Sequence, residues 1–192
     1  MIRVTRKDAL IAVDIQNDFL PGGALGIHEG HRIVPIVNSL LPKFETLVYT
    51  RDWHPPDHKS FSDNPEYRDG SWPPHCVRDT PGAAFHEDLD VPDRAHIVSK
   101  ATEPGREEYS SFQARNHDLA EWLRAQGVTR VFVAGLATDY CVLNTALDAR
   151  RAGFEVYVIE DAVAGVGEDT IKKAWKDMAA AGVHVIDSGD LE

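Results

Sequence analysis

Cys141 lies in a segment whose residue types suit covalent catalysis. Residues 131–133 read Val-Phe-Val and are followed by Gly135, a pattern typical of a buried parallel strand that ends in a turn. Apolar residues then recur at helical spacing, at Val142, Leu143, Ala146, Leu147 and Ala149, with Thr138 and Asp139 as candidate helix caps. Cys141 would lie in the first turn of that helix, where free N–H groups and the helix dipole favour a thiolate and can hold a developing oxyanion.

A lone cysteine is also a common buried apolar residue, so its interpretation depends on partners elsewhere in the chain. Asp14 follows the apolar run 9–13, and Lys100 follows the apolar run 95–99. Because the carboxyl ends of parallel strands meet at one edge of a sheet, we expect Asp14, Lys100 and Cys141 to lie close together. Asp14 could accept the thiol proton, and Lys100 could stabilise the negative charges. The alternative for Asp14 and Lys100 is an ion pair that only joins strand ends.

A second group of side chains has the composition of a metal site. Asp52 and His54 form an Asp-x-His pair directly after the apolar run 46–50. Alternate residues on an extended segment share one side, and two imidazoles with a carboxylate suit zinc, manganese or iron. His75 lies in the rigid run SWPPHCV and is a candidate third ligand, with His58 as a candidate fourth. The chain holds nine histidines, so the Asp-x-His pair alone is a weak indication.

The apolar patterns predict the elements that would position these residues. We expect strands at 9–13, 46–50, 95–99, 128–133, 154–159 and 183–186, and helices at 31–44, 118–126, after Cys141 and at 168–181. This alternation predicts an α/β fold with a doubly wound, mostly parallel six-stranded sheet and helices on both faces, in one domain over 1–192. The proline-rich stretch 55–92 has no periodicity and is expected to be a functional loop.

Charge and composition limit the partners. Twenty basic and thirty-one acidic residues give a net charge of −11, which disfavours nucleic acids and anionic membrane surfaces and suits a small neutral or cationic ligand. Two cysteines are too few for a secreted disulfide framework, and no apolar run is long enough to span a bilayer. We therefore expect a cytoplasmic protein without a signal peptide. The sequence leaves the oligomeric state open, with a homo-oligomer as one option.

Five segments carry a resemblance to a known family, namely DIQNDFLPGG, TRDWHPPDH, SWPPHCV, Lys100 followed by YSSF, and AGLATDYCV. In this order they resemble the nicotinamidase/pyrazinamidase branch of the isochorismatase-like cysteine hydrolases. The resemblance implies hydrolysis of nicotinamide to nicotinate and ammonia through a cysteine thioester, with pyrazinamide as a further small-molecule carboxamide substrate. It also implies one divalent metal ion, zinc first, with iron or manganese as alternatives.

The resemblance also implies a role for individual residues. The implied catalytic triad is Asp14, Lys100 and Cys141, and the implied metal ligands are Asp52, His54 and His75. It implies an oxyanion hole made by the backbone N–H groups of Ala137 and Cys141, and a cis peptide bond between Leu136 and Ala137. The implied substrate-binding aromatics are Phe19, Trp72 and Tyr109. His58 varies in role among relatives, and the segment 102–108 receives no role.

Three alternatives remain at this point. The metal could generate hydroxide directly, with Cys141 only structural. The chain could be a non-catalytic ligand-binding domain, or a related hydrolase of isochorismate, carbamoylated amines or ureido compounds, although those branches generally lack this metal pattern.

Overall fold

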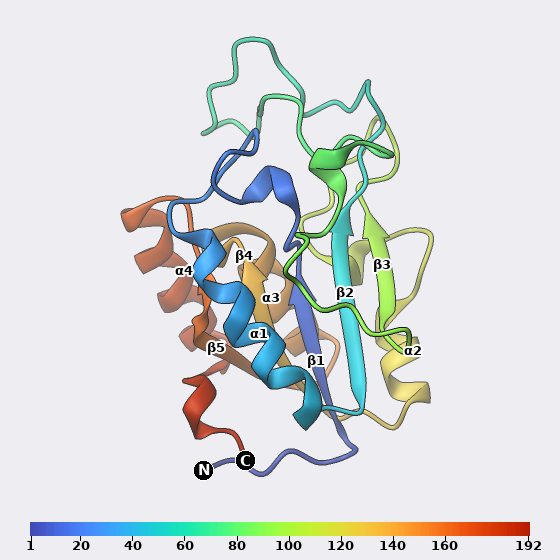
Figure 1. The fold of residues 1–192 in the computed structure, drawn as a ribbon, viewed down its shortest axis with the longest axis vertical. Coiled ribbons are helices and arrows are strands. Elements are labelled where there is room, and N and C mark those ends of the chain that lie inside the picture. Colours follow the sequence, from blue (N-terminus) through green and yellow to red (C-terminus); the bar gives the residue numbers. More distant parts are fainter.

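The computed structural model describes residues 1–192, and one sheet of six parallel strands runs through it (Figure 1). The strands are β1 (Asp8–Val13), β2 (Thr46–Asp52), β3 (His96–Lys100), β4 (Arg130–Leu136), β5 (Glu155–Ala164) and β6 (His184–Ile186), in the spatial order β3-β2-β1-β4-β5-β6. The α-helices are α1 (Ile33–Leu40), α2 (Leu119–Ala125), α3 (Leu143–Arg151) and α4 (Glu168–Ala180). The predicted doubly wound α/β sheet is confirmed, and every strand pair is parallel.

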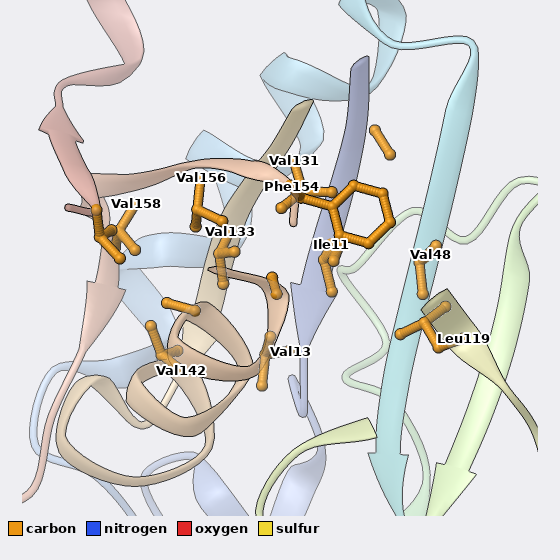
Figure 2. Close-up of a cluster of buried hydrophobic side chains, with 14 of the residues drawn as sticks. Ile11, Val13, Val48, Leu119, Val131, Val133, Val142, Phe154, Val156 and Val158 are labelled. Carbon is orange, nitrogen blue, oxygen red and sulfur yellow. The ribbon is translucent and has the colours of Figure 1, made fainter. Parts of the chain in front are cut away.

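Alternate residues of each strand face opposite sides of the sheet, which divides the core into two layers. Ile11 and Val13 pack with residues of α2, α3 and α4, and Figure 2 shows this layer with Leu119 and Val142 among its labelled side chains. Leu10 and Ala12 pack on the other side with α1. Burying an aliphatic side chain of this size contributes about 1.5–3 kcal/mol. The two layers hold the strand ends in fixed relative positions.

The largest differences in extent from the sequence-based predictions are at α1 and β5. The predicted helix 31–44 is α1 flanked by 3₁₀ turns at Gly30–Arg32 and Leu41–Lys43. Pro42 lies in the second turn, and a proline has no N–H with which to continue an α-helical ladder. Strand β5 continues past Glu160, because a register shift between Val133 and Gly135 of β4 lets its later residues pair again.

The strand order reverses between β1 and β4, and ligands of such sheets bind outside the carboxyl ends of the strands at this point. The segment between β2 and β3, teal to green in Figure 1, lies over these ends. Its residues 55–92 contain no strand or α-helix, as predicted.

None of the helices has the length and apolar content that crossing a bilayer would require.

Gly135 of β4 is required by the close approach of β1, and this generates a stability prediction. Its φ is +119°, and a β-carbon there would lie 2.1 Å from the carbonyl oxygen of Val13. Gly153 has a φ of +94° with no atom within 4 Å of a β-carbon, so it is a matched control for strain without a clash. We expect Gly153→Ala to cost about 1–2 kcal/mol and Gly135→Ala to cost at least twice that in urea unfolding. Equal losses would contradict the close approach of β1 and β4.

Candidate active site

A buried ammonium group lies where four segments meet. Lys100 ends β3 and is in register with Asp52, the last residue of β2, while Asp14 directly follows β1. The Lys100 Nζ atom lies 2.8 Å from Asp14 Oδ2, contacts Asp52 Oδ1, and lies 3.4 Å from the sulfur of Cys141. Lys100 and Asp14 are fully buried. The structure therefore brings together Asp14, Lys100 and Cys141, which the sequence places in three separate segments.

Burial and charge act in opposite directions on these groups. Burial alone would lower the pKa of Lys100, but the carboxylates of Asp14 and Asp52 raise that pKa well above its usual value, so the ammonium stays charged. Burial raises the pKa of Asp14, against the opposing effect of Lys100. The Asp14 Oδ1 atom accepts a hydrogen bond of 2.7 Å from the Thr50 hydroxyl. Asp14 is thus a fixed carboxyl group with raised proton affinity beside a sulfur atom.

The turn that carries Cys141 differs from the expected α-helical start. Residues Thr138–Val142 form a π-helical turn before α3, and the Ala137 carbonyl accepts hydrogen bonds from the N–H groups of Tyr140 and Val142. The predicted capping by Thr138 and Asp139 is wrong. The Asp139 carboxylate instead accepts hydrogen bonds from Val166 and Gly167, so it joins this turn to the start of α4. The Leu136–Ala137 peptide bond is cis, as the resemblance implied.

The burial of Cys141 acts against the thiolate that its position at a helix start predicts. Burial raises the pKa of Cys141 well above its usual value; Lys100 lowers it, and the carboxylate of Asp14 raises it again. Burial outweighs the helix dipole because Cys141 is only 6% exposed. A base is therefore needed to ionise the sulfur, and Asp14 is in place to act as one.

Asp52, His54 and His75 direct one donor atom each toward a common point. The His54 Nε2 atom lies 3.3 Å from His75 Nε2 and 3.5 Å from Asp52 Oδ2, and the third separation is 3.9 Å. Donors about 2.1 Å from one ion are separated by roughly 3–3.5 Å, so two of these separations fit an ion and the third is slightly long. The Nδ1 atoms face the carbonyl oxygens of Ala101 and Pro73, which leaves both Nε2 atoms for a metal.

The charge states of Asp52 and His75 suit a cation, whereas for His54 burial lowers the pKa and the Asp52 carboxylate raises it above its usual value, so a metal would replace a proton there. Burial lowers the pKa of His75 to about 4, so its ring is neutral near pH 7 and can offer a lone pair. Although burial would raise the pKa of Asp52, Lys100 and His54 hold it below its usual range, so the carboxylate is ionised. Two imidazoles and a carboxylate form a donor set of the type that zinc, manganese and iron accept.

His58 lies beside this group without joining it. Its ring centroid is 4.2 Å from that of His54, but both of its nitrogen atoms already have partners. The Nδ1 atom lies 2.8 Å from the Ser60 hydroxyl oxygen, and the Nε2 atom lies 2.8 Å from the Arg106 carbonyl oxygen. In this arrangement neither nitrogen is free to bind a metal.

A mostly apolar cavity of about 460 Å³ opens in front of the sulfur. Phe19, Trp72 and Tyr109 line it together with Ala137, Cys141 and the metal-site residues Asp52 and His75. The Phe19 ring lies 5.6 Å from that of His75, and the Trp72 indole N–H donates a 3.3 Å hydrogen bond to the Tyr109 hydroxyl. Small ligand sites are commonly apolar cavities of this size with a few polar groups.

Tyr140 and Glu107 are among the cavity residues that the sequence analysis did not identify. Tyr140 lines the cavity and packs edge-on against Trp72, with ring centroids 5.3 Å apart. Tyr140 directly precedes Cys141 in the sequence, and this adjacency could have identified it as a cavity residue. Glu107 also lines the cavity and lies near His54 and His58. Only the fold shows this, because nothing in the sequence places Glu107 near β2.

The segment 102–108, to which the sequence analysis gave no role, supports the metal-site histidines. Glu108 is buried, and its carboxylate accepts a 2.8 Å hydrogen bond from the N–H of Ala101, the residue after Lys100. The same carboxylate pairs with Arg106, whose carbonyl oxygen contacts His58. These contacts hold the Ala101 carbonyl against His54.

The burial of Lys100 generates a second stability prediction. Removing one partner of a buried ion pair costs about 3–5 kcal/mol, because the opposite charges stay buried and unpaired. We expect this loss for Lys100→Met in urea unfolding of the metal-free protein at pH 7. The loss should shrink as the pH falls toward 4, because protonation of Asp14 and Asp52 removes the unpaired charges. The control Lys173→Met breaks an exposed pair with Asp177 and should cost no more than about 0.5 kcal/mol. Equal losses in the two variants would contradict a buried ammonium.

Comparisons with known proteins agree with this geometry. Residues 8–190 match the isochorismatase domain. The chain is 41% identical over 186 residues to a nicotinamidase/pyrazinamidase of Mycobacterium tuberculosis, covering 93% of this chain and 97% of the relative. It is 38% identical over 200 residues to a nicotinamidase of Acinetobacter baylyi, covering 95% of this chain and 94% of the relative.

Solved structures give the same result. A pyrazinamidase of Pyrococcus horikoshii in complex with zinc is 48% identical, with a TM-score of 0.86 over 94% of this chain and 99% of that one. The PnC1 protein of L. infantum in complex with nicotinate is 37% identical, with a TM-score of 0.90 over 100% of this chain and 98% of that one. The domain match and the relatives of high coverage show that this chain belongs to the isochorismatase family and is a carboxamide hydrolase.

Proposed function

We propose that the protein hydrolyses nicotinamide to nicotinate and ammonia through a thioester on Cys141, and that it also accepts pyrazinamide. The observation that carries this proposal is the position of the buried Lys100 ammonium, which contacts Asp14 and also Asp52 and Cys141, two residues that line the apolar cavity. The relatives named nicotinamidase support the choice of substrate. Because Cys141 must remain a thiol, a reducing compartment such as the cytoplasm suits the reaction.

The proposed ligands of one divalent ion are Asp52, His54 and His75. Zinc is the preferred ion, with iron or manganese as alternatives, and it would act as a Lewis acid that binds the pyridine nitrogen. The zinc complex of the Pyrococcus horikoshii relative supports this choice of metal. His58 is assigned a supporting role, because both of its ring nitrogens have protein partners. Phe19 and Trp72 are the proposed walls around the aromatic ring, with Tyr109 as a further wall.

Asp14 begins the reaction as the general base. Its carboxylate removes the proton from the Cys141 thiol, and Lys100 stabilises the thiolate that results. The sulfur then attacks the carboxamide carbon and forms a tetrahedral intermediate. The proposed oxyanion hole, the N–H groups of Ala137 and Cys141, would hold the developing oxygen charge.

Asp14 then acts as the general acid. It gives its proton to the departing nitrogen, so that ammonia leaves and the thioester forms. A water molecule loses a proton to the same carboxylate and attacks the thioester carbon. The C–S bond breaks and the sulfur recovers the proton held by Asp14. The carboxylic acid that is formed leaves as nicotinate and gives its proton to solvent or to the released ammonia. The raised pKa of Asp14 suits a group that must both accept and return a proton.

Cys141→Ala separates the thioester route from attack by a metal-bound hydroxide. We expect ammonia release from nicotinamide to fall by at least 10⁴-fold in this variant, because it removes the nucleophile. Mass spectrometry of the quenched wild-type reaction should show a nicotinoyl adduct on Cys141. Retention of most turnover by Cys141→Ala would contradict the thioester route. Turnover of a ureido compound with no activity on nicotinamide would contradict the substrate assignment.

The metal-ligand assignment predicts a difference between two neighbouring histidines. His75→Ala should weaken zinc binding by at least 100-fold in a chelator competition, because it removes a donor atom. His58→Ala should weaken it by about 10-fold, since it removes only a supporting contact. Activity lost on treatment with a chelator should return with added zinc. If His58→Ala abolished zinc binding and His75→Ala did not, the assignment would be reversed.

A further inference from the structure

Gln16 holds the main chain of Asp52 from both sides. Its side chain is fully buried. The amide nitrogen donates hydrogen bonds to the carbonyl oxygens of Asp52 at 2.8 Å and Ala83 at 2.9 Å. The amide oxygen accepts a bond of 2.9 Å from the Asp52 N–H. Only an amide can form this set of three bonds, because a carboxylate could accept the third bond but has no hydrogen to donate in the first two.

The Asp18 side chain likewise forms hydrogen bonds with the backbone of the loop that carries His75. Its Oδ2 atom accepts a 2.8 Å hydrogen bond from the N–H of Cys76, the residue after His75. Its Oδ1 atom accepts a 3.3 Å bond from the N–H of Ala24, which lines the cavity. Because both oxygens accept, the contacts require a carboxylate: an asparagine has one acceptor and would turn its NH₂ group against the other N–H.

The backbone held by Asp18 is in an unfavourable conformation. The φ of Cys76 is +46°, in the left-handed region that costs a non-glycine residue about 1–2 kcal/mol. Its N–H is fixed by Asp18, and its carbonyl oxygen accepts a 3.0 Å hydrogen bond from the N–H of His54. These two bonds set the direction in which the neighbouring His75 side chain leaves the chain.

A third loop, at Gly82, lies close to the Asp18 carboxylate. A β-carbon on Gly82 would lie 2.2 Å from Asp18 Oδ2 and 2.5 Å from Asp18 Oδ1. The half-buried carboxylate therefore lies between the loops at Ala24, Cys76 and Gly82. Gly82→Ala would displace it without changing any proposed metal ligand.

We propose that Gln16 and Asp18 are positioning residues that arrange Asp52, His54 and His75 before the metal binds. The inference rests on the proposed function, because it takes these three residues as the metal ligands. Asp14, Gln16 and Asp18 lie within five residues of one another, so the general base and the two residues that hold the ligand loops belong to one segment. Neither Gln16 nor Asp18 is a metal ligand itself.

The test uses substitutions that keep side-chain shape and exchange donors for acceptors. Zinc affinity is measured on the metal-free protein by competition with a chromogenic chelator. We expect Gln16→Glu, Asp18→Asn and Gly82→Ala each to weaken zinc binding by 10–100-fold, as loss of outer-shell contacts does elsewhere. Urea unfolding and far-ultraviolet circular dichroism on the same samples check that each variant is folded.

Two substitutions of the same kind away from the site serve as controls. The Asn38 amide donates to the Asp88 carbonyl and accepts from the Asp90 N–H, and the Asp118 carboxylate accepts from the Glu121 N–H at the start of α2. Both positions are more exposed than Gln16, so Asn38→Asp and Asp118→Asn should cost less stability and should leave zinc affinity unchanged. A purely structural role of Gln16 and Asp18 would make all five variants behave alike.

The outcomes separate this inference from the proposed function. If the wild-type protein binds zinc and the folded site variants bind it equally well, the positioning inference is overturned and the ligand assignment stands. If the wild-type protein binds no zinc, both are overturned. If Asp18→Asn does not fold, the zinc affinities of Gln16→Glu and Gly82→Ala test the positioning inference in the same way.

Discussion

The active site depends on one buried ammonium group shared by three partners. Lys100 Nζ contacts Asp14 and Asp52 and lies near the sulfur of Cys141, with no exposure to solvent. Two carboxylates and a nucleophilic sulfur could not remain packed together without this charge, because the cost of desolvating unpaired charges is several kcal/mol per ion. The sheet makes the arrangement possible, since its parallel strands deliver Asp14, Asp52 and Lys100 to one edge.

Asp52 connects the two halves of the site because its two oxygens face different neighbours. Its Oδ1 atom contacts Lys100, and its Oδ2 atom lies 3.5 Å from His54 Nε2 and 3.9 Å from His75 Nε2. The ammonium beside Cys141 and the donor set for a cation are therefore linked through a single carboxylate. A change in charge beside Cys141 therefore alters the electrostatic energy of the metal-ligand group, and the reverse also holds. The distances are short and the local dielectric constant is low, so this effect is strong.

The sequence predicted the sheet and the convergence of strand ends well, because apolar runs bounded by polar residues report buried parallel strands directly. It predicted Asp14, Lys100 and Cys141 as neighbours for the same reason. It failed where a side chain serves a distant element: Asp139 binds the start of α4 instead of capping its own helix, and Glu108 supports the residue after Lys100. It also did not predict that burial raises the pKa of Cys141, since local helix position does not report how deeply the sulfur is buried. Such contacts depend on loop packing, which has no periodic signature.

A crystal structure of the zinc-loaded protein with nicotinate bound would test the central claim, that Lys100 and Asp52 join a nucleophile and a metal seat around one substrate. We expect zinc between Asp52, His54 and His75, the pyridine nitrogen toward the metal, and the carboxyl carbon about 3–3.5 Å from the sulfur of Cys141. Nicotinate bound with its carboxyl group away from Cys141, or zinc bound outside these three residues, would contradict the account.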